Sequence, residues 1–239
     1  FTDPDAIQFF PRRLSMKICY LLPGLGMSTA EIARREKILN RIAAQGTTVE
    51  ITVVEDGPLA IENAIDEYQA MPNILKFILR HQDEYDALII GCAGDAGLEG
   101  AREQARIPIV GPGESSILLG ALGDKRFSMV TTSAERAAIK RRLVREAGLD
   151  VNRLVSSHSL DIPVLEMGKD VKKTQAALIR AMKEAKTKGA DVMILGCLSP
   201  AFMDSALLKE AEKKAGIPLV NPIVTAVKMA EALAAMRAY

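Results

Sequence analysis

Short apolar runs alternate with longer amphipathic stretches along most of the chain. Runs rich in Ile, Val and Leu predict buried strands at 18–22, 49–54, 87–90, 107–110, 127–131, 154–157, 192–195 and 217–220. The stretches between them predict helices, of which the clearest cover 28–44, 61–80, 135–147 and 171–188. Strands that alternate with helices in this way favour parallel α/β sheets with helices on both faces.

The second half of the chain repeats the pattern of the first. The segment 86–92 reads DALIIGC, and 191–197 reads DVMILGC, at an offset of 105 residues. Each is followed by a predicted helix and then by IPIV at 107–110 or IPLV at 217–220. We therefore predict two similar parallel-sheet α/β lobes, related by pseudo-two-fold duplication. Because parallel sheets bind ligands beyond the carboxyl ends of their strands, we expect the site in the cleft between the lobes.

Two helix starts and two helix ends support this division. The segments 28–31 (STAE) and 132–135 (TSAE) fit the capping box, in which a hydroxyl and a carboxylate three residues later bind first-turn amides. Gly46 and Gly148 are predicted to end the two helices in the left-handed conformation.

The domain boundaries follow from the same pattern. Residues 1–15 do not begin with Met and show no clear period, so we interpret them as a leader or as an arm left by cloning. The first lobe is expected over 16–112, completed by a C-terminal helix over 221–239. The second lobe is expected over 113–220.

Composition excludes several classes of protein. The 239 residues carry 31 Lys+Arg and 30 Asp+Glu, with no basic block and no Trp, which argues against a nucleic-acid-binding protein. No apolar run approaches the roughly 18–20 residues of a membrane-spanning helix. Three scattered cysteines and two histidines give neither a disulfide framework nor zinc-ligand spacing. We expect a cytoplasmic protein without a metal site.

Two of the three cysteines occupy matched positions. Cys92 and Cys197 each follow a glycine, directly after a predicted strand and before a predicted helix. Amides at a helix N-terminus lower a thiol pKa and favour the thiolate. Two thiols on opposite walls of one cleft suit inversion of a stereocentre, with one removing a proton and the other supplying one to the opposite face. The alternative is that they fill the core, which we assign to Cys19 within the first strand.

The residues around the first cysteine resemble a known family. The segment 91–103 (GCAGDAGLEGARE), followed by PIVG at 108–111 and Glu114, resembles the first cysteine motif of the hydantoin racemases, within the aspartate/glutamate racemase superfamily. The segments 126–132 (RFSMVTT) and 189–197 (GADVMILGC) extend a resemblance that covers nearly all of the chain from Met16. It implies a racemase or epimerase that needs no cofactor and acts on a small molecule, with Cys92 and Cys197 as acid and base. It also implies a homo-oligomer.

The resemblance also implies substrate contacts from loops that follow strands. By position, these fall on the loop after the first strand, on the residues after each cysteine, and on the hydroxyls at the start of the second lobe, namely Pro23, Gly24, Ala93, Gly94, Leu198, Thr131 and Thr132. Asp95 is a further candidate, either at the substrate or behind the Cys92 loop, although an Asp there also fits a plain helix cap. Thr132 likewise fits a cap as well as a binding residue.

The residues of the same loops limit the class of substrate that we expect. Amino-acid racemases of the superfamily resemble this chain but have polar residues where it has Ala93-Gly94 and Leu198-Ser199, and many members have a polar residue in the first loop. Aliphatic residues there remove the groups expected for a free ammonium and carboxylate. A neutral ring, such as a 5-substituted hydantoin or allantoin, is therefore favoured over aspartate or glutamate.

Several alternatives remain open at this point. A relative could isomerise a maleate-like double bond or decarboxylate a malonate, although such decarboxylases keep only the second cysteine. A two-lobed binding protein without catalysis is a further class. The glycines at 24 and 26 with Glu55 only partly match a nicotinamide-binding fingerprint.

Three groups of polar residues have simpler interpretations than catalysis. His158 could face the cleft but lies at a strand end near serines, and Glu114 fits a solvated carboxylate at a helix start. The basic stretch of Arg136, Lys140, Arg141, Arg142 and Arg145 is interpreted as the solvent-facing side of a helix.

Overall fold

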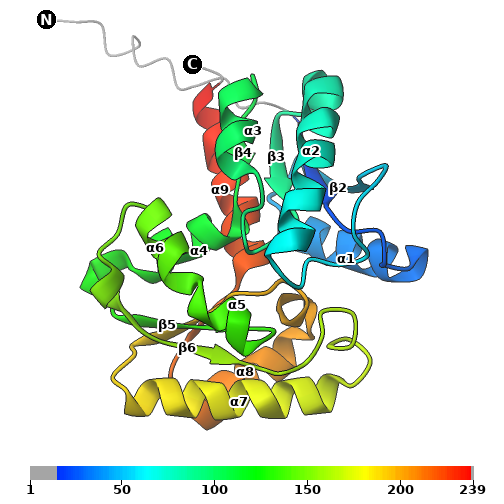
Figure 1. Ribbon diagram of the computed structural model, residues 1–239. Coiled ribbons are helices and arrows are strands. Elements are labelled where there is room, and N and C mark those ends of the chain that lie inside the picture. The colour runs from blue at the N-terminus through cyan, green and yellow to red at the C-terminus, as the bar shows by residue number, and fades with distance from the viewer. Residues whose placement is uncertain (1–14, 238–239) are drawn as a thin grey trace, which may run out of the picture.

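The computed structural model describes residues 15–237 and contains two four-stranded parallel sheets (Figure 1). The first sheet has the order β2-β1-β3-β4 and the second β6-β5-β7-β8, so the two lobes share one topology. The two similar lobes predicted from the sequence repeat are therefore confirmed. The segment 1–14, which belongs to the predicted leader or arm, lies outside the described residues, and so do residues 238–239.

The strands follow the apolar runs closely. Their bounds are Met16–Leu22 (β1), Thr47–Val53 (β2), Ala87–Ile90 (β3), Ile109–Val110 (β4), Phe127–Thr131 (β5), Leu154–Ser159 (β6), Val192–Leu195 (β7) and Leu219–Val220 (β8). The last strand of each lobe is shorter than predicted. Pro108 and Pro218 precede these two strands, and a proline has no amide hydrogen for a sheet ladder.

Helices cover the sheets and connect their strands. Their bounds are Thr29–Ile42 (α1), Ala64–His81 (α2), Leu98–Gln104 (α3), Pro112–Gly120 (α4), Ala134–Ala138 (α5), Lys140–Glu146 (α6), Val171–Thr187 (α7), Ser205–Ala215 (α8) and Pro222–Arg237 (α9). Short 3-10 segments lie at Gln82–Glu84, Leu122–Asp124, Val151–Arg153 and Pro200–Phe202. The single helix predicted over 135–147 is wrong, because Ile139, at φ −88° and ψ −2°, divides it into α5 and α6.

At the first helix start the hydroxyl half of the predicted capping box is confirmed, whereas the Glu31 carboxylate accepts hydrogen bonds from Arg34 and Arg35. At the second start the cap is shifted by one residue. The Ser28 hydroxyl accepts a hydrogen bond from the Glu31 amide at 3.3 Å. At the second start, Ser133 and not Thr132 caps the helix, since its hydroxyl accepts from the Arg136 amide. Gly148, at φ 75°, follows the Ala147 cap of α6 in the predicted left-handed conformation. Gly46 is also left-handed, at φ 88°, but it does not end α1, which stops at Ile42 with Ala43 as its cap.

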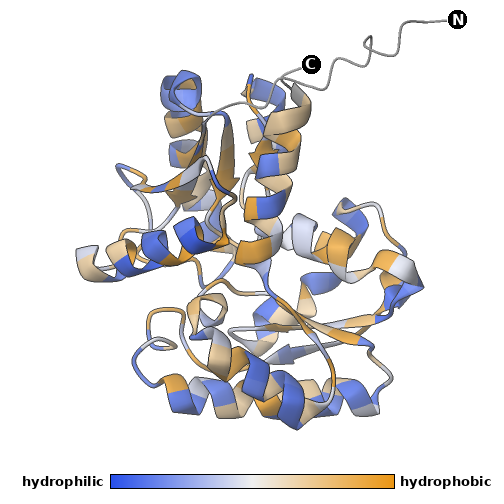
Figure 2. Ribbon diagram, turned by 180° about the vertical axis from the view of Figure 1, so that it is seen from behind, coloured by the Kyte–Doolittle hydropathy of each residue, from blue (hydrophilic) through white to orange (hydrophobic). Residues whose placement is uncertain are grey.

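Apolar side chains join the two lobes. The Tyr20 ring of β1 packs edge-on against Phe202 of the second lobe, with centroids 6.2 Å apart. Helix α9 crosses back to the first lobe, where it contacts β3 and β4, and it also packs against α4, which lies on the second sheet (Figure 1). On α7, polar residues face out and small or apolar residues every third or fourth position face the sheet (Figure 2). No helix among residues 15–237 has the length and apolarity needed to cross a bilayer.

Candidate active site

A pocket lies where the carboxyl ends of the two central strand pairs meet. In each sheet the chain order reverses between neighbouring strands, β1 and β3 in the first and β5 and β7 in the second. Ligands of parallel sheets bind at such reversal points because the loops after the two strands diverge there. The loops after all four strands line one pocket, which the predicted cysteines Cys92 and Cys197 share.

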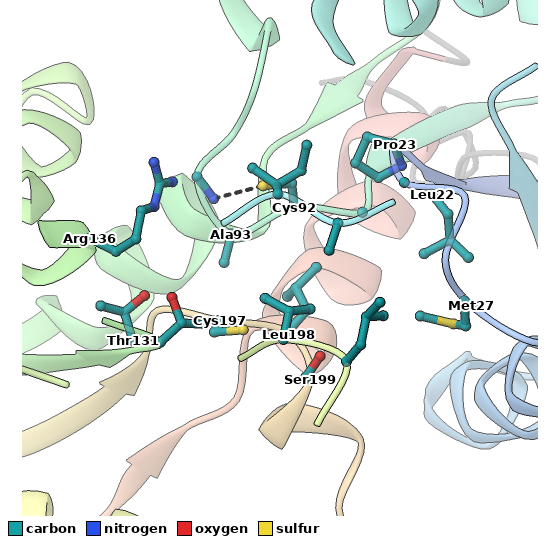
Figure 3. A pocket seen from close by; sticks show the side chains of 18 of the residues that line it. Leu22, Pro23, Met27, Cys92, Ala93, Thr131, Arg136, Cys197, Leu198 and Ser199 are labelled. Atoms are coloured by element: carbon teal, nitrogen blue, oxygen red, sulfur yellow. Dashed lines mark hydrogen bonds between the residues drawn. The ribbon is translucent and has the colours of Figure 1, made fainter. Parts of the chain in front are cut away.

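The two thiols have matched surroundings on opposite walls of this pocket. Cys92 is on the loop after β3 of the first lobe, and Cys197 is on the loop after β7 of the second (Figure 3). The Gly94 amide donates to the Cys92 sulfur at 3.4 Å, and the Ser199 amide is the equivalent donor to Cys197. Both thiols are partly exposed, whereas Cys19 is buried in β1, as predicted.

The net effect on the thiol pKa values is opposite to the one predicted. Burial raises the pKa of Cys92 to about 11, and it also raises the pKa of Cys197. The Gly94 amide and Arg136 lower the Cys92 pKa, but by less than burial raises it. An uncharged thiol is favoured in a poorly solvated site unless positive charge compensates for the lost water.

Most residues predicted to contact substrate line the pocket. These are Pro23, Gly24, Ala93, Gly94, Thr131, Thr132 and Leu198. Both threonines are buried, and the Thr131 hydroxyl donates to the Gly196 carbonyl at 3.3 Å. Since Ser133 is the helix cap, the Thr132 hydroxyl is not required for that task.

Asp95 lies outside this pocket. Its carboxylate accepts hydrogen bonds from the Gly113 amide at 2.8 Å and the Glu114 amide at 2.6 Å, in the first turn of α4. Asp95 has φ 54°, a left-handed value that Asp tolerates better than most residues. The side chain thus ties the Cys92 loop to α4, which corrects the expectation of a substrate contact and agrees with a role behind the Cys92 loop. Asp95 does not cap its own helix, because the N-cap of α3 is Gly97.

We expect Asp95→Ala to lower the free energy of unfolding by about 2–4 kcal/mol, because it leaves two helix amides without their charged acceptor. Asp95→Asn should lose less, since its side-chain oxygen still accepts one hydrogen bond. Urea unfolding at pH 7 measures both. An Asp95→Ala protein as stable as the parent would contradict this role.

Three cations of the site were not predicted, and two were wrongly assigned to solvent. Arg136 is 6% exposed and Lys140 is 1% exposed, and Arg35 is also buried. Arg136 and Arg35 line the pocket. A signal was available in the sequence, because positions 136, 140, 143 and 144 would share one face of the single helix predicted over 135–147, and Leu143 and Val144 are buried.

The cations differ in their partners. Arg136 pairs with Glu67 at 2.5 Å, and Arg35 pairs with Glu31 at 2.8 Å. Lys140 donates to the Gly196 carbonyl at 3.1 Å and has no carboxylate within 4 Å among the described residues. Because Gly196 directly precedes Cys197, this unpaired ammonium sits behind one of the two thiols.

The opposite end of the pocket is apolar. Its side chains come from the first loop, from the segment before α2 and from the segment before α7, and they are Leu22, Met27, Leu59, Ile61, Val164 and Leu165. Leu59 is 67% exposed and Leu165 is 37% exposed, so the apolar surface extends to the mouth. The Val164 amide donates to the Glu62 carboxylate at 2.7 Å and joins the two lobes at this rim.

Other candidate groups lie elsewhere. His158 is within β6, 2.8 Å from the Ser156 hydroxyl, and does not line the pocket. Glu114 pairs with Arg102 at 2.5 Å. Within residues 15–237, no three His, Cys, Asp or Glu side chains gather as metal ligands would.

Most of the sequence matches a known protein family. A family model described as Asp/Glu/Hydantoin racemase matches residues 27–233. A hydantoin racemase from Rhizobium meliloti is 32% identical over 180 residues, which cover 74% of this chain and 73% of that protein.

Solved structures give the same picture. An allantoin racemase from Klebsiella pneumoniae superposes with a TM-score of 0.80 at 29% identity, covering 93% of this chain and 89% of that one. An allantoin racemase from Pseudomonas fluorescens superposes with a TM-score of 0.83 at 24% identity, covering 93% and 92%, which supports the fold alone.

Proposed function

This chain belongs to the Asp/Glu/Hydantoin racemase family and is a racemase, and from that premise we propose that it inverts the stereocentre of 5-substituted hydantoins without a cofactor. We propose Cys92 and Cys197 as its acid and base. The observation that carries this proposal is the pair of thiols on opposite walls of one pocket, at equivalent positions in two duplicated lobes (Figure 3).

The mechanism is two proton transfers on opposite faces of one carbon. One thiolate removes the proton from the stereocentre, and the electron pair moves into the neighbouring carbonyl as an enolate. The other thiol then protonates the carbon from the opposite face and becomes the thiolate. Atoms and charge balance, and the exchanged roles allow the reverse reaction on the other enantiomer.

The lining of the pocket supports a neutral ring with an apolar substituent. The ring would lie between the cysteines, with backbone amides and Thr131 and Thr132 as polar contacts. A 5-substituent would then reach the apolar end at Met27, Leu59 and Leu165. Such a surface favours aliphatic or aromatic groups over the polar ureido group of allantoin. The relatives named hydantoin racemase support the same substrate class.

The test is optical. The reduced protein, with no added cofactor, is incubated with enantiopure 5-isobutylhydantoin, 5-benzylhydantoin, allantoin, aspartate and glutamate, and the circular dichroism signal is followed. We expect the signal of the two alkyl-substituted hydantoins to decay fastest. Decay for the amino acids alone would contradict the substrate class, and a flat trace for all five would direct the search to maleate-like substrates.

Three expectations remain predictions. They are the homo-oligomer, the cytoplasmic location and the lobe boundaries at 16–112 and 113–220. Helix α2 exposes Ile65 and Tyr68, each about two-thirds accessible, which is compatible with contact between copies.

A further inference from the structure

Arg136 carries a buried hydrogen-bond donor with no partner. Its guanidinium lines the pocket beside the Cys92 loop (Figure 3). Nη2 donates to Glu67, but Nη1 is fully buried and has no acceptor among the described residues. Buried donors are nearly always satisfied, because an unpaired one costs about 1–3 kcal/mol and more for a charged group. Because the side chain that carries this donor lines the pocket, a ligand oxygen is suited to supply the missing acceptor.

The rest of the guanidinium is held firmly. The Arg136–Glu67 pair joins α5 of the second lobe to α2 of the first, and both side chains are 7% exposed. Gly94 leaves space for this pair, since a Cβ at that position would lie only 2.7 Å from Arg136 Nη2. The carboxylate holds the pKa of Arg136 above its usual value although burial alone would lower it, so the cation is retained. A fixed, charged donor needs little reorganisation when a ligand binds.

The charged side chains around Arg136 favour a ligand on which negative charge develops. Glu67 offsets Arg136, and Arg142, which lies 3.7 Å from the same carboxylate, is paired with Glu146 at 3.4 Å. Lys140 adds an ammonium without a carboxylate partner. Removing a proton from a hydantoin at C5 moves negative charge onto the oxygen of the adjacent carbonyl.

We propose that Arg136 is a catalytic residue that binds this carbonyl oxygen through Nη1 and stabilises the enolate, with Glu67 positioning the guanidinium. The inference rests on the proposed function, because it takes a substrate with a carbonyl next to the stereocentre. It adds an electrophile to a pair of acid–base thiols. The two roles are separable, since the thiols move the proton and the guanidinium accommodates the charge.

The first test is kinetic. Arg136→Met should lower kcat/KM for 5-benzylhydantoin by about 10²- to 10³-fold, the usual loss when one preorganised donor to a developing oxyanion is removed. Arg136→Lys keeps the charge but not the planar donor geometry, so its kcat/KM should fall between that of the parent and that of Arg136→Met. The matched control is Arg145→Met, which removes an exposed cation of α6 that does not line the pocket. It should stay within about threefold of the parent.

The second test separates binding from a purely structural role. In a Cys92→Ala, Cys197→Ala background, calorimetry compares 5-benzylhydantoin with 4-benzylimidazolidin-2-one, which lacks the carbonyl next to the stereocentre. Arg136→Met should weaken hydantoin binding about 10-fold or more and leave the imidazolidinone within about twofold, as expected for one charged hydrogen bond. If Arg136→Met does not fold, Glu67→Leu combined with Arg136→Met removes both buried charges and carries the same comparison.

The outcomes are distinct. Equal weakening of both compounds, or an Arg136→Met enzyme that racemises at the parental rate, overturns the role of Arg136 and leaves the proposed function standing. A parent protein that racemises no hydantoin overturns the proposed function and this inference together.

Discussion

Replacing Cys92 or Cys197 with alanine is expected to lower the rate of hydantoin racemisation by at least about 10³-fold, because each removes one of two proton-transfer groups. Neither wall of the pocket offers a second acid or base at the same position, since the neighbouring residues are Ala93 and Leu198. The circular dichroism assay measures the loss. Cys19→Ala is the matched control, because that thiol is buried in β1 away from the pocket.

Hydrogen exchange gives this prediction its sharper form. In deuterated water each single variant should still exchange the C5 proton of one enantiomer, with retention of configuration, through its remaining cysteine. Cys92→Ala and Cys197→Ala should act on opposite enantiomers, since the two thiols lie on opposite walls (Figure 3). Full-rate racemisation by either variant, or exchange of the same enantiomer by both, would argue against the two-cysteine mechanism.

Replacing Lys140 with methionine is expected to stabilise the protein at pH 7 by about 2 kcal/mol. Burial and, to a smaller extent, the charge of Arg136 lower the pKa of Lys140 from 10.5 to about 8. Between about pH 8 and 10.5 the unfolded chain therefore holds a proton that the native protein lacks, so stability rises with pH across this window. Below it the cost of the buried ammonium is present in full, at 1.36 kcal/mol for each unit of pKa shift, less the lost hydrogen bond to Gly196.

The same substitution should impair catalysis. Lys140 lowers the pKa of Cys197, so its removal should move the rising limb of kcat/KM to higher pH and reduce the rate near neutrality. Urea unfolding from pH 7 to 10.5 and a pH–rate profile measure the two effects. Arg141→Met, which changes the exposed neighbour, should alter neither. A Lys140→Met protein that is less stable at pH 7, or that keeps the parental slope between pH 8 and 10.5, would contradict this account.

Opposite effects on stability and activity would explain why such a residue is present. A buried ammonium without a carboxylate destabilises the fold, whereas positive charge near the two thiols of the pocket favours the thiolate. Burial raises the pKa of Asp95 and Lys140 lowers it in part. The Asp95 carboxylate, however, already accepts hydrogen bonds from the Gly113 and Glu114 amides. The site thus combines Lys140, a cation that lowers the stability of the fold, with two thiols whose pKa values are raised by burial.

Local patterns in the sequence were sufficient for the fold and for the position of the pocket. The apolar runs and the repeat of Asp86–Cys92 at Asp191–Cys197 determined two lobes of equal topology, because strand burial and parallel pairing depend on alternation that is visible along the chain. Because ligands bind at the carboxyl ends of parallel strands, the sequence also predicted that the loops of Cys92 and Cys197 line one site. Small errors arose where one residue decides, as with the cap at Ser133 and the break at Ile139.

Only the tertiary structure decided the electrostatics of the site. The sequence pattern predicted that Arg136 and Lys140 face solvent. They are buried because their helices lie against the second sheet, and Glu67 of the first lobe pairs with Arg136. The pKa values of the two thiols likewise depend on how far the folded protein removes them from water, and for Cys92 this desolvation outweighs the hydrogen bond from the Gly94 amide. Hydrophobic periodicity is a local property of the chain, whereas desolvation and charge pairing depend on groups far apart in sequence, and these are determined only when the two lobes pack together.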